Sequence, residues 1–348
     1  MASSSAPSVG RFWIGQRLAN GNTPRLEPNT QTYTYVASAI NIAITILEHP
    51  KSLEVLAAAA YKTDLWFATG GGILHRHSGR ARNTQEVKIE LRNGYFPNVL
   101  IDETITEPNL LGLHMRNHYH RQFQVDQFPF REQNIHLNAP MVQQMVASAG
   151  SRAGGQEFRN WLFKVATCLA HEATHVLITC LTGGGGPSGG TPPPVADPAG
   201  AYRPNPTKGE SGRFLEWAAL GGNIHWDYND REDRRSTGVP YLVQTGTTLP
   251  SAWKIDENTI NNVVTYNITL PFPGRVFTPW RTNTTPENTQ PRPTAVNPNM
   301  FQGAIVVMDD LKEVLDVVKK NKKAQLKEFK SKRTGNTYWG FNEIKAKS

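Results

Sequence analysis

The stretch CLAHEATHVLITCLTGGGG, residues 168–186, places two histidines and a glutamate inside an apolar run of helix length. His171 and His175 are four residues apart, so on a helix they lie on one face, one turn from each other. Glu172 lies about 100° further round the same helix. Histidine is a poor helix former and a buried carboxylate is costly without a partner. The two histidines and the glutamate are therefore expected to have a role other than filling the core.

The spacing of these polar residues is that of the H-E-x-x-H motif of zinc hydrolases. Two imidazole nitrogens directed at one point provide two ligands for Zn²⁺, and a glutamate beside them can accept a proton from a water molecule. We therefore predict His171 and His175 as metal ligands and Glu172 as the general base. The alternative is an ordinary core helix whose polar residues bond to their neighbours.

The surrounding residues predict that the motif lies on a helix over 155–181, because apolar residues recur at helical spacing and Gly183–Gly186 end the pattern. Cys168 and Cys180 are the only cysteines, and both fall on this helix. Their Cα atoms would be about 18 Å apart, whereas a disulfide requires less than about 7 Å. The chain is therefore expected to fold in a reducing, cytoplasmic setting.

The whole chain divides into four regions: an irregular N-terminal arm (1–32), an α+β lobe with the motif helix (33–182), a Gly/Pro-rich loop (183–209) and a C-terminal lobe (210–348). The loop composition predicts a flap or spacer that packs no core. Helices are expected over 35–49, from 52 after Pro50, over 209–222 and, with an amphipathic pattern, over 303–329. Strands are expected over 86–92, 98–105, 133–138 and 261–272.

A rival metal site is offered by HMRNHYH, residues 114–120, which contains three histidines. His118 and His120 would share one face of a strand. No acidic or cysteine partner stands at a spacing typical of metal sites, so a structural or surface role is favoured over metal binding.

The net charge of +8 is concentrated at the C-terminal end. Residues 311–348 contain 11 Lys and Arg against 4 Asp and Glu, a net +7. A second reading of the function therefore assigns nucleic-acid or acidic-partner binding, or nuclear targeting, to residues 319–333. A solvated helix end explains the same charges. No run of 18 apolar residues and no secretory leader is found, so no membrane partner is expected.

A third ligand is expected because catalytic zinc is held by three protein groups with one position open. The stretch ESGRFLE, residues 210–216, offers Glu210 and Glu216. Together with HEATH it resembles the thermolysin-like gluzincins, in which E-S-G is followed, after three residues, by the ligand Glu. The resemblance covers about residues 135–222 and implies Glu216 as the third ligand, with Glu210 in a supporting role. It also implies that Asn138 and Ala139, in HLNAP, pair with substrate backbone from an edge strand.

The resemblance is incomplete at one position that matters for the metal. The family has an Asp four residues after the ligand Glu, where it supports the first zinc histidine, and this chain has Leu220 there. Asp227 is a candidate replacement. Thermolysin-like enzymes stabilise the oxyanion with His and Tyr side chains, for which His225 and Tyr228, with Tyr241, are the downstream candidates.

These patterns together predict an α+β, zincin-like fold with a mixed sheet, an active-site helix, a second ligand-bearing helix and a C-terminal amphipathic helix. The expected function is that of a zinc-dependent hydrolase, a metallopeptidase acting on a peptide or on a small-molecule carbonyl substrate. Two alternatives stay open: a zincin-fold enzyme with a non-peptide, biosynthetic substrate, and the basic-tail binder.

Overall fold

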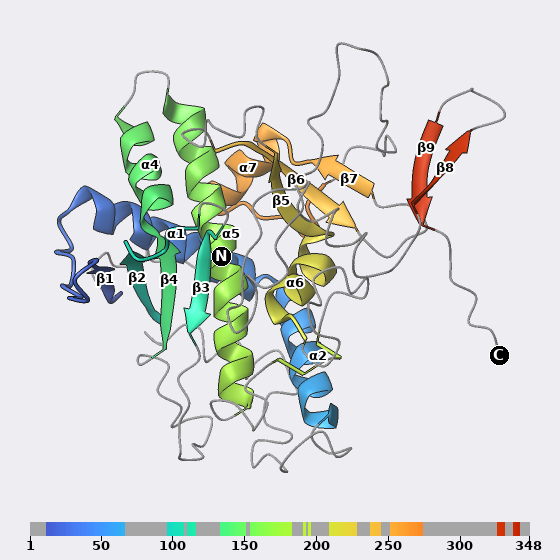
Figure 1. Ribbon diagram of the computed structural model, residues 1–348, viewed down its shortest axis with the longest axis horizontal. Coiled ribbons are helices and arrows are strands. Elements are labelled where there is room, and N and C mark those ends of the chain that lie inside the picture. The colour runs from blue at the N-terminus through green and yellow to red at the C-terminus, as the bar shows by residue number, and fades with distance from the viewer. Residues whose placement is uncertain are drawn as a thin grey trace, which may run out of the picture.

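The computed structural model of the chain is α+β, as predicted, with a mixed β-sheet packed against helices (Figure 1). It describes residues 12–66, 96–107, 110–115, 133–150, 154–182, 191–192, 194–195, 209–227, 237–244, 251–273, 326–330 and 337–341.

The first two helices are separated at the predicted proline. α1 (Gln31–Glu48) begins after Thr30, whose side chain accepts a hydrogen bond from the backbone N of Tyr33. α2 (Pro50–Trp66) begins at Pro50, where a missing N–H does no harm because the first turn has no partner for it. The helices expected over 35–49 and from 52 are therefore confirmed.

The main sheet has the strand order β1-β2-β4-β3. β1 (Ile14–Arg17), β2 (Asn98–Asp102) and β4 (Asn134–Asn138) are parallel, and β3 (Gly112–Met115) pairs with β4 in the antiparallel direction. The strands expected within 98–105 and 133–138 are confirmed, whereas 86–92 lies outside the described residues. The prediction of an irregular arm over 1–32 is wrong at β1, because Ile14 is fully buried and its strand extends the parallel sheet.

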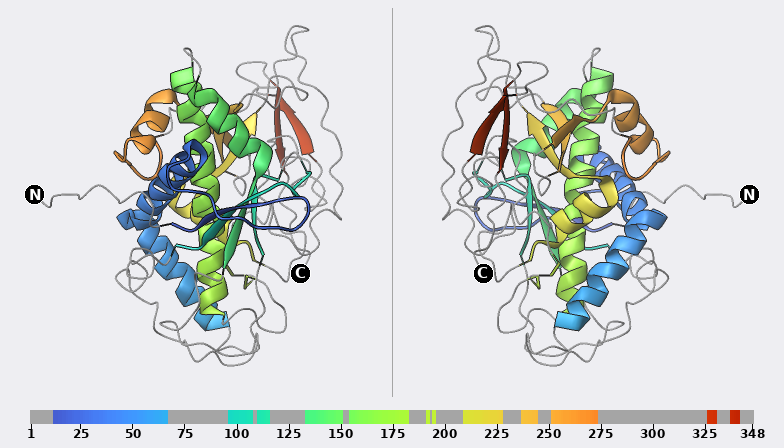
Figure 2. Two further views of the ribbon diagram at one scale, coloured as in Figure 1. Left: turned by 90° about the vertical axis from the view of Figure 1, so that its left-hand side faces the viewer. Right: turned by 90° about the vertical axis from the view of Figure 1, so that its right-hand side faces the viewer.

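Helices α4 (Ala139–Ala149) and α5 (Gly154–Leu181) follow the sheet in the chain. α5 confirms the helix predicted over 155–181 and contacts α1, α4, α6 and β3. Figure 2 shows that the sheet lies on one side of α5, with α1 and α2 on the other. Cys168 and Cys180 are both buried along α5 and are not joined by a disulfide. The motif histidines therefore sit on the central helix of the core.

The helix predicted over 209–222 is present in two segments. An α-helical turn, α6 (Ser211–Leu215), continues directly into a π-helical turn, η4 (Glu216–Leu220). Gly221, at a φ of 96°, ends the helix at the predicted place. π-helical turns are uncommon and occur frequently at functional sites.

A second sheet is antiparallel, with the order β5-β6-β7: β5 (Asn223–Asp227), β6 (Val239–Gln244) and β7 (Ser251–Lys254). The strand predicted over 261–272 is wrong, because α7 (Glu257–Val264) occupies its first part. The side chain of Asp256 accepts a hydrogen bond from the backbone N of Thr259 and caps this helix. Ile260 and Val263 are then buried on one helical face, which overrides the β propensity of the sequence.

The C-terminal described residues form an antiparallel hairpin of β8 (Leu326–Lys330) and β9 (Thr337–Phe341). The long helix expected over 303–329 is therefore wrong at its last residues, which form a strand. Residues 303–325 lie outside the described part of the chain, as does most of the basic segment 319–333.

One continuous hydrophobic core runs from Phe12 to Phe272 and crosses the predicted lobe boundary. Residues of α1, α5 and β5 share it, so the proposed N- and C-terminal lobes have no separate cores among the described residues. Val195, inside the Gly/Pro-rich loop, is fully buried in the same cluster. The expectation that this loop contributes nothing to the core is therefore wrong at Val195.

None of the helices in the described part of the chain combines the length and the apolarity needed to cross a membrane.

Candidate metal centre

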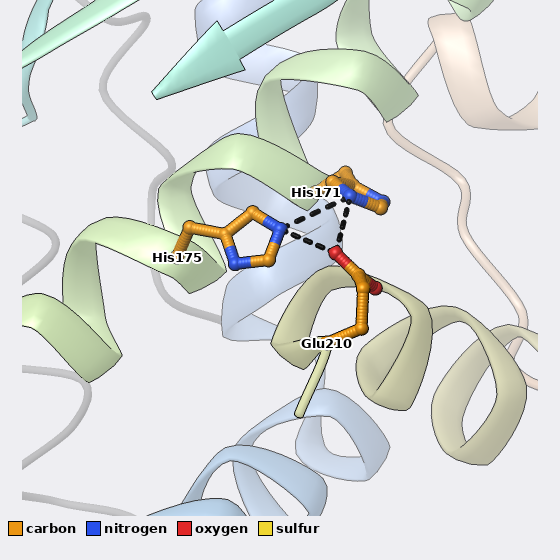
Figure 3. Close-up of side chains that lie close together, drawn as sticks. All are labelled: His171, His175 and Glu210. Carbon is orange, nitrogen blue, oxygen red and sulfur yellow. Dashed lines mark hydrogen bonds and ion pairs between the residues drawn. The ribbon is translucent and has the colours of Figure 1, made fainter. Parts of the chain in front are cut away.

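The two motif histidines converge as their spacing predicts. His171 and His175 extend from consecutive turns of α5, and both are fully buried. Their Nε2 atoms are 3.2 Å apart, with the ring planes steeply inclined (Figure 3). Two ligand atoms at tetrahedral angles around zinc, each at about 2.0–2.1 Å, are separated by a little over 3 Å. The histidine pair therefore has the spacing that a shared metal ion requires.

A glutamate from the second helix completes this group. The Oε1 atom of Glu210 is 2.6 Å from His175 Nε2 and 3.2 Å from His171 Nε2 (Figure 3). One ligand atom from each of these residues lies within 4.8 Å of the others. Glu210 is the N-cap of α6, and its Oε2 accepts a hydrogen bond from the backbone N of Arg213. One carboxylate oxygen of Glu210 thus caps the N-terminus of α6, while the other faces the two histidines.

The described part of the Gly/Pro-rich loop holds Glu210 in place. The backbone N of Glu210 donates to Val195 O at 2.8 Å, and the backbone N of Gly209 donates to Thr191 O at 2.6 Å. A Cβ atom at Gly209 would lie 2.0 Å from Pro192 O, so only glycine permits this approach. The loop is therefore a positioning element for a candidate ligand as well as a connection.

The other ring nitrogen of each histidine is held by a side chain from the second helix. Glu216 Oε1 lies 2.7 Å from His171 Nδ1, and Ser211 Oγ lies 2.7 Å from His175 Nδ1. A proton on Nδ1 of His171, donated to the carboxylate, leaves Nε2 as an acceptor directed at the shared point. Carboxylate and hydroxyl groups in this position orient metal-binding histidines and raise their basicity.

These contacts reverse the roles expected for the two glutamates. Glu210, assigned a supporting role, belongs to the group that could bind a metal ion, whereas Glu216, assigned as a ligand, contacts the far side of the His171 ring. The six-residue separation points the two carboxylates in different directions, and each meets a different nitrogen of the same imidazole. Glu216 thus contacts the imidazole that the resemblance would have an Asp support, at the position of Leu220, with Asp227 as the candidate replacement.

The electrostatics of this group indicate a site for a cation. Burial alone would lower the pKa of His171, but the carboxylates of Glu210 and Glu216 outweigh it and raise that pKa to about 10. Burial likewise opposes ionisation of Glu210, yet the two histidines bring its pKa well below the usual value. Oε1 of Glu210 nevertheless forms no hydrogen bond of normal geometry with the described residues. The Nε2 atoms of the two histidines and Oε1 of Glu210 therefore face one point. A proton or a metal ion at that point can neutralise the charge of the Glu210 carboxylate, and the donor set suits zinc.

The predicted general base lies beside this group. Glu172 is fully buried, and neither carboxylate oxygen accepts a hydrogen bond of normal geometry among the described residues. Burial raises the pKa of Glu172 to about 8; the charge of Glu210 adds to this effect, while His171 and the backbone N–H of His114 oppose it. A buried carboxyl group with a strongly raised pKa beside a candidate metal site is a candidate for proton transfer.

The residues expected to bind substrate are used structurally. Asn138 ends β4, which lies between β2 and β3 and is not an edge strand. Its side chain donates to Leu110 O at 3.0 Å and accepts from the backbone N of Met141, which caps α4. Ala139 is almost completely buried. The expected pairing of Asn138 and Ala139 with substrate is therefore wrong for an interior strand.

Two of the expected oxyanion donors, His225 and Tyr241, lie opposite each other on neighbouring strands of the second sheet. His225 is fully buried in β5, opposite Tyr241 of β6, and burial together with nearby Arg213 brings its pKa well below the usual value. Tyr228 lies outside the described residues. His118 and His120 of the rival histidine cluster also lie outside them, and both ring nitrogens of His114 have partners, in Asn134 O and Thr179 Oγ1.

Comparison with known proteins found no protein-family profile, no curated protein and no solved structure that matches the chain. The assignment of function therefore rests on the geometry of the site.

Proposed function

We propose that the chain is a zinc-dependent hydrolase that cleaves peptide bonds, with His171, His175 and Glu210 as the metal ligands and Glu172 as the general base. The proposal depends on one observation above all. Two imidazole Nε2 atoms and one carboxylate oxygen converge within 4.8 Å, in a buried place next to the fully buried carboxyl group of Glu172.

The chemistry of the proposed site follows from its donor set. Zinc, when bound, would supply a Lewis acid that polarises a carbonyl group and lowers the pKa of a bound water molecule to about 7. Three protein donors leave one position for water or substrate. Glu172 takes up the proton of the attacking water and passes it to the leaving nitrogen. Glu216 and Ser211 keep the two imidazoles oriented, because Glu216 is hydrogen-bonded to Nδ1 of His171 and Ser211 to Nδ1 of His175.

The arrangement around the site is the basis for proposing a zincin-like fold, whereas the gluzincin resemblance loses support because Glu216, its implied ligand, contacts His171 Nδ1. The long helix α5 carries the motif and packs against β3, the antiparallel end strand of the described sheet. A Cβ atom at Gly112 would lie 2.7 Å from Cys168 Sγ, so β3 approaches α5 closely. We propose that β3, rather than Asn138 and Ala139 of β4, offers backbone groups to an extended peptide, and this is the feature that favours a peptide substrate.

The substitution Glu172→Gln tests the proposal. The amide keeps the shape of the side chain but cannot accept the proton, so turnover of a peptide library should fall by about 10²–10⁴-fold while zinc stays bound. Glu157→Gln is the matched control, since Glu157 lies on the same helix and accepts from Thr237, away from the site. Turnover by Glu172→Gln within tenfold of the unmodified chain would remove Glu172 from the mechanism. Zinc binding without peptide turnover by the unmodified chain would contradict the peptide substrate and favour the non-peptide alternative.

A further inference from the structure

Arg213 is one of the largest fully buried side chains, with 1% of its surface exposed. A buried guanidinium is stable only when charged and polar groups surround it. Its Nη1 atom donates to Glu216 Oε2 at 2.7 Å and to the backbone oxygen of Ile224 at 3.1 Å. Arg213 therefore links α6 to β5. It does so beside Glu216, the residue whose carboxylate contacts the His171 ring.

Both oxygens of Glu216 are occupied in directions that fix the carboxylate. Oε1 accepts from His171 Nδ1 at 2.7 Å, and Oε2 accepts from Arg213 Nη1 and from the backbone N of Ile224 at 3.0 Å. Because the second oxygen is held by two donors, the carboxylate cannot rotate without losing them. The imidazole of His171 is thereby held with Nε2 directed at Glu210 and His175.

The charges point to the same role. Glu210 and Glu216 approach His171 from two sides, and Glu172 lies close to the same ring. The Nη1 atom of Arg213 lies 2.7 Å from Glu216 Oε2, so the guanidinium offsets the charge of this buried carboxylate.

We propose that Arg213 is a positioning residue of the metal centre: through Glu216 it orients His171 and tightens metal binding, although it does not contact the metal itself. This proposal rests on the proposed zinc site. If Arg213 instead only ties α6 to β5, its loss will lower the stability of the fold without changing the metal affinity or the ligand geometry of the folded molecules.

The test compares Arg213→Met with Arg159→Met in the full-length chain. Arg159 is a matched control because it lies on α5 and its guanidinium donates to Gln156, near the start of the helix. Zinc affinity is measured by competition with a chelator, and the Co²⁺-substituted proteins are compared by absorption spectroscopy. We expect Arg213→Met to bind zinc about 10–100-fold more weakly and to change the Co²⁺ spectrum, with both unchanged in Arg159→Met.

Arg213→Lys provides a second variant in case the methionine variant does not fold. An ammonium group keeps the charge but is placed differently from Nη1, the atom that bonds both Glu216 and the Ile224 oxygen, so we expect partial recovery of affinity relative to Arg213→Met. In Arg213→Lys alone the expected result is weaker zinc binding with a shifted spectrum. If a folded Arg213 variant has the same zinc affinity and the same Co²⁺ spectrum as the unmodified chain, the positioning role is overturned. The proposed function is then unaffected. Absence of metal binding by the unmodified chain overturns both.

Discussion

Replacement of Gly212 by alanine should disrupt the metal centre through a single added methyl group. Gly212 lies in α6, directly against the ring of His171. A Cβ atom there would lie 2.3 Å from His171 Cδ2 and Nε2 and 2.5 Å from Cε1, whereas ordinary contact begins at 3.4 Å. The ring or the helix must therefore withdraw by about 1 Å, several times the ±0.2 Å tolerance of metal–ligand distances.

The displacement falls on the atom that the metal requires. A shift of about 1 Å in Nε2 removes one of the proposed donors, so we expect zinc affinity to fall by at least about 100-fold. Overpacking of a filled core also costs about 1–3 kcal/mol of stability. Zinc affinity is measured by chelator competition, and stability is measured by urea unfolding in the presence of a chelator.

Gly155→Ala is the matched control on α5. A Cβ at Gly155 meets only the flexible end of Arg159, at 3.6 Å. Alanine is the better helix former by about 0.5–1 kcal/mol, so this variant should bind zinc normally and be slightly more stable. If Gly212→Ala binds zinc as tightly as Gly155→Ala does, the close packing of α6 on His171 does not define the site, and the reasoning fails.

Two further predictions follow from side-chain hydrogen bonds. Ser211→Ala removes the group at His175 Nδ1, so zinc affinity measured by competition should fall about tenfold, and an unchanged affinity would contradict this orienting role. His136 bonds to Asp102 at 2.7 Å, and burial lowers the pKa of His136 below its usual 6.5 despite that partner. The unfolded chain therefore binds a proton first as the pH falls, and stability is lost below about pH 6.5, by at most about 1.4 kcal/mol per pH unit for one group. Urea unfolding between pH 7.5 and 5.5 should show a shallower loss in His136→Gln, and an equal slope would exclude this group.

The motif helix could be predicted from the sequence because two periodicities agree there. The apolar residues of α5 recur at helical spacing, and the four-residue separation of His171 and His175 places both on one face. Neither inference needs knowledge of distant parts of the chain. The structure accordingly has a helix over Gly154–Leu181 with the two Nε2 atoms 3.2 Å apart.

The roles of Glu210 and Glu216 could not be predicted in the same way. Their angular separation follows from helix geometry, but it does not say which nitrogen of His171 each carboxylate meets. That depends on where the second helix begins and how closely it packs. Gly212 allows α6 to touch the His171 ring, and the bonds from Gly209 and Glu210 to the loop set the start of the helix.

Tertiary packing also decided the elements that were predicted wrongly. Val263 and Val264 have strand propensity, but the cap by Asp256 and the burial of Ile260 and Val263 place them in a helix. β1 is only four residues long, and three of them are Gly15, Gln16 and Arg17, so its local pattern is weak. It becomes a strand because β2 offers a parallel partner about 85 residues away.

The most direct test of the central claim is the zinc content of the purified chain after exposure to zinc and removal of the excess. We predict about one zinc per chain, and almost none in Glu210→Gln or His175→Ala. The unmodified chain should also melt at a higher temperature with zinc than with a chelator. A chain that takes up no zinc, or a Glu210→Gln variant that holds zinc as tightly as the unmodified protein, would contradict the metal centre described above.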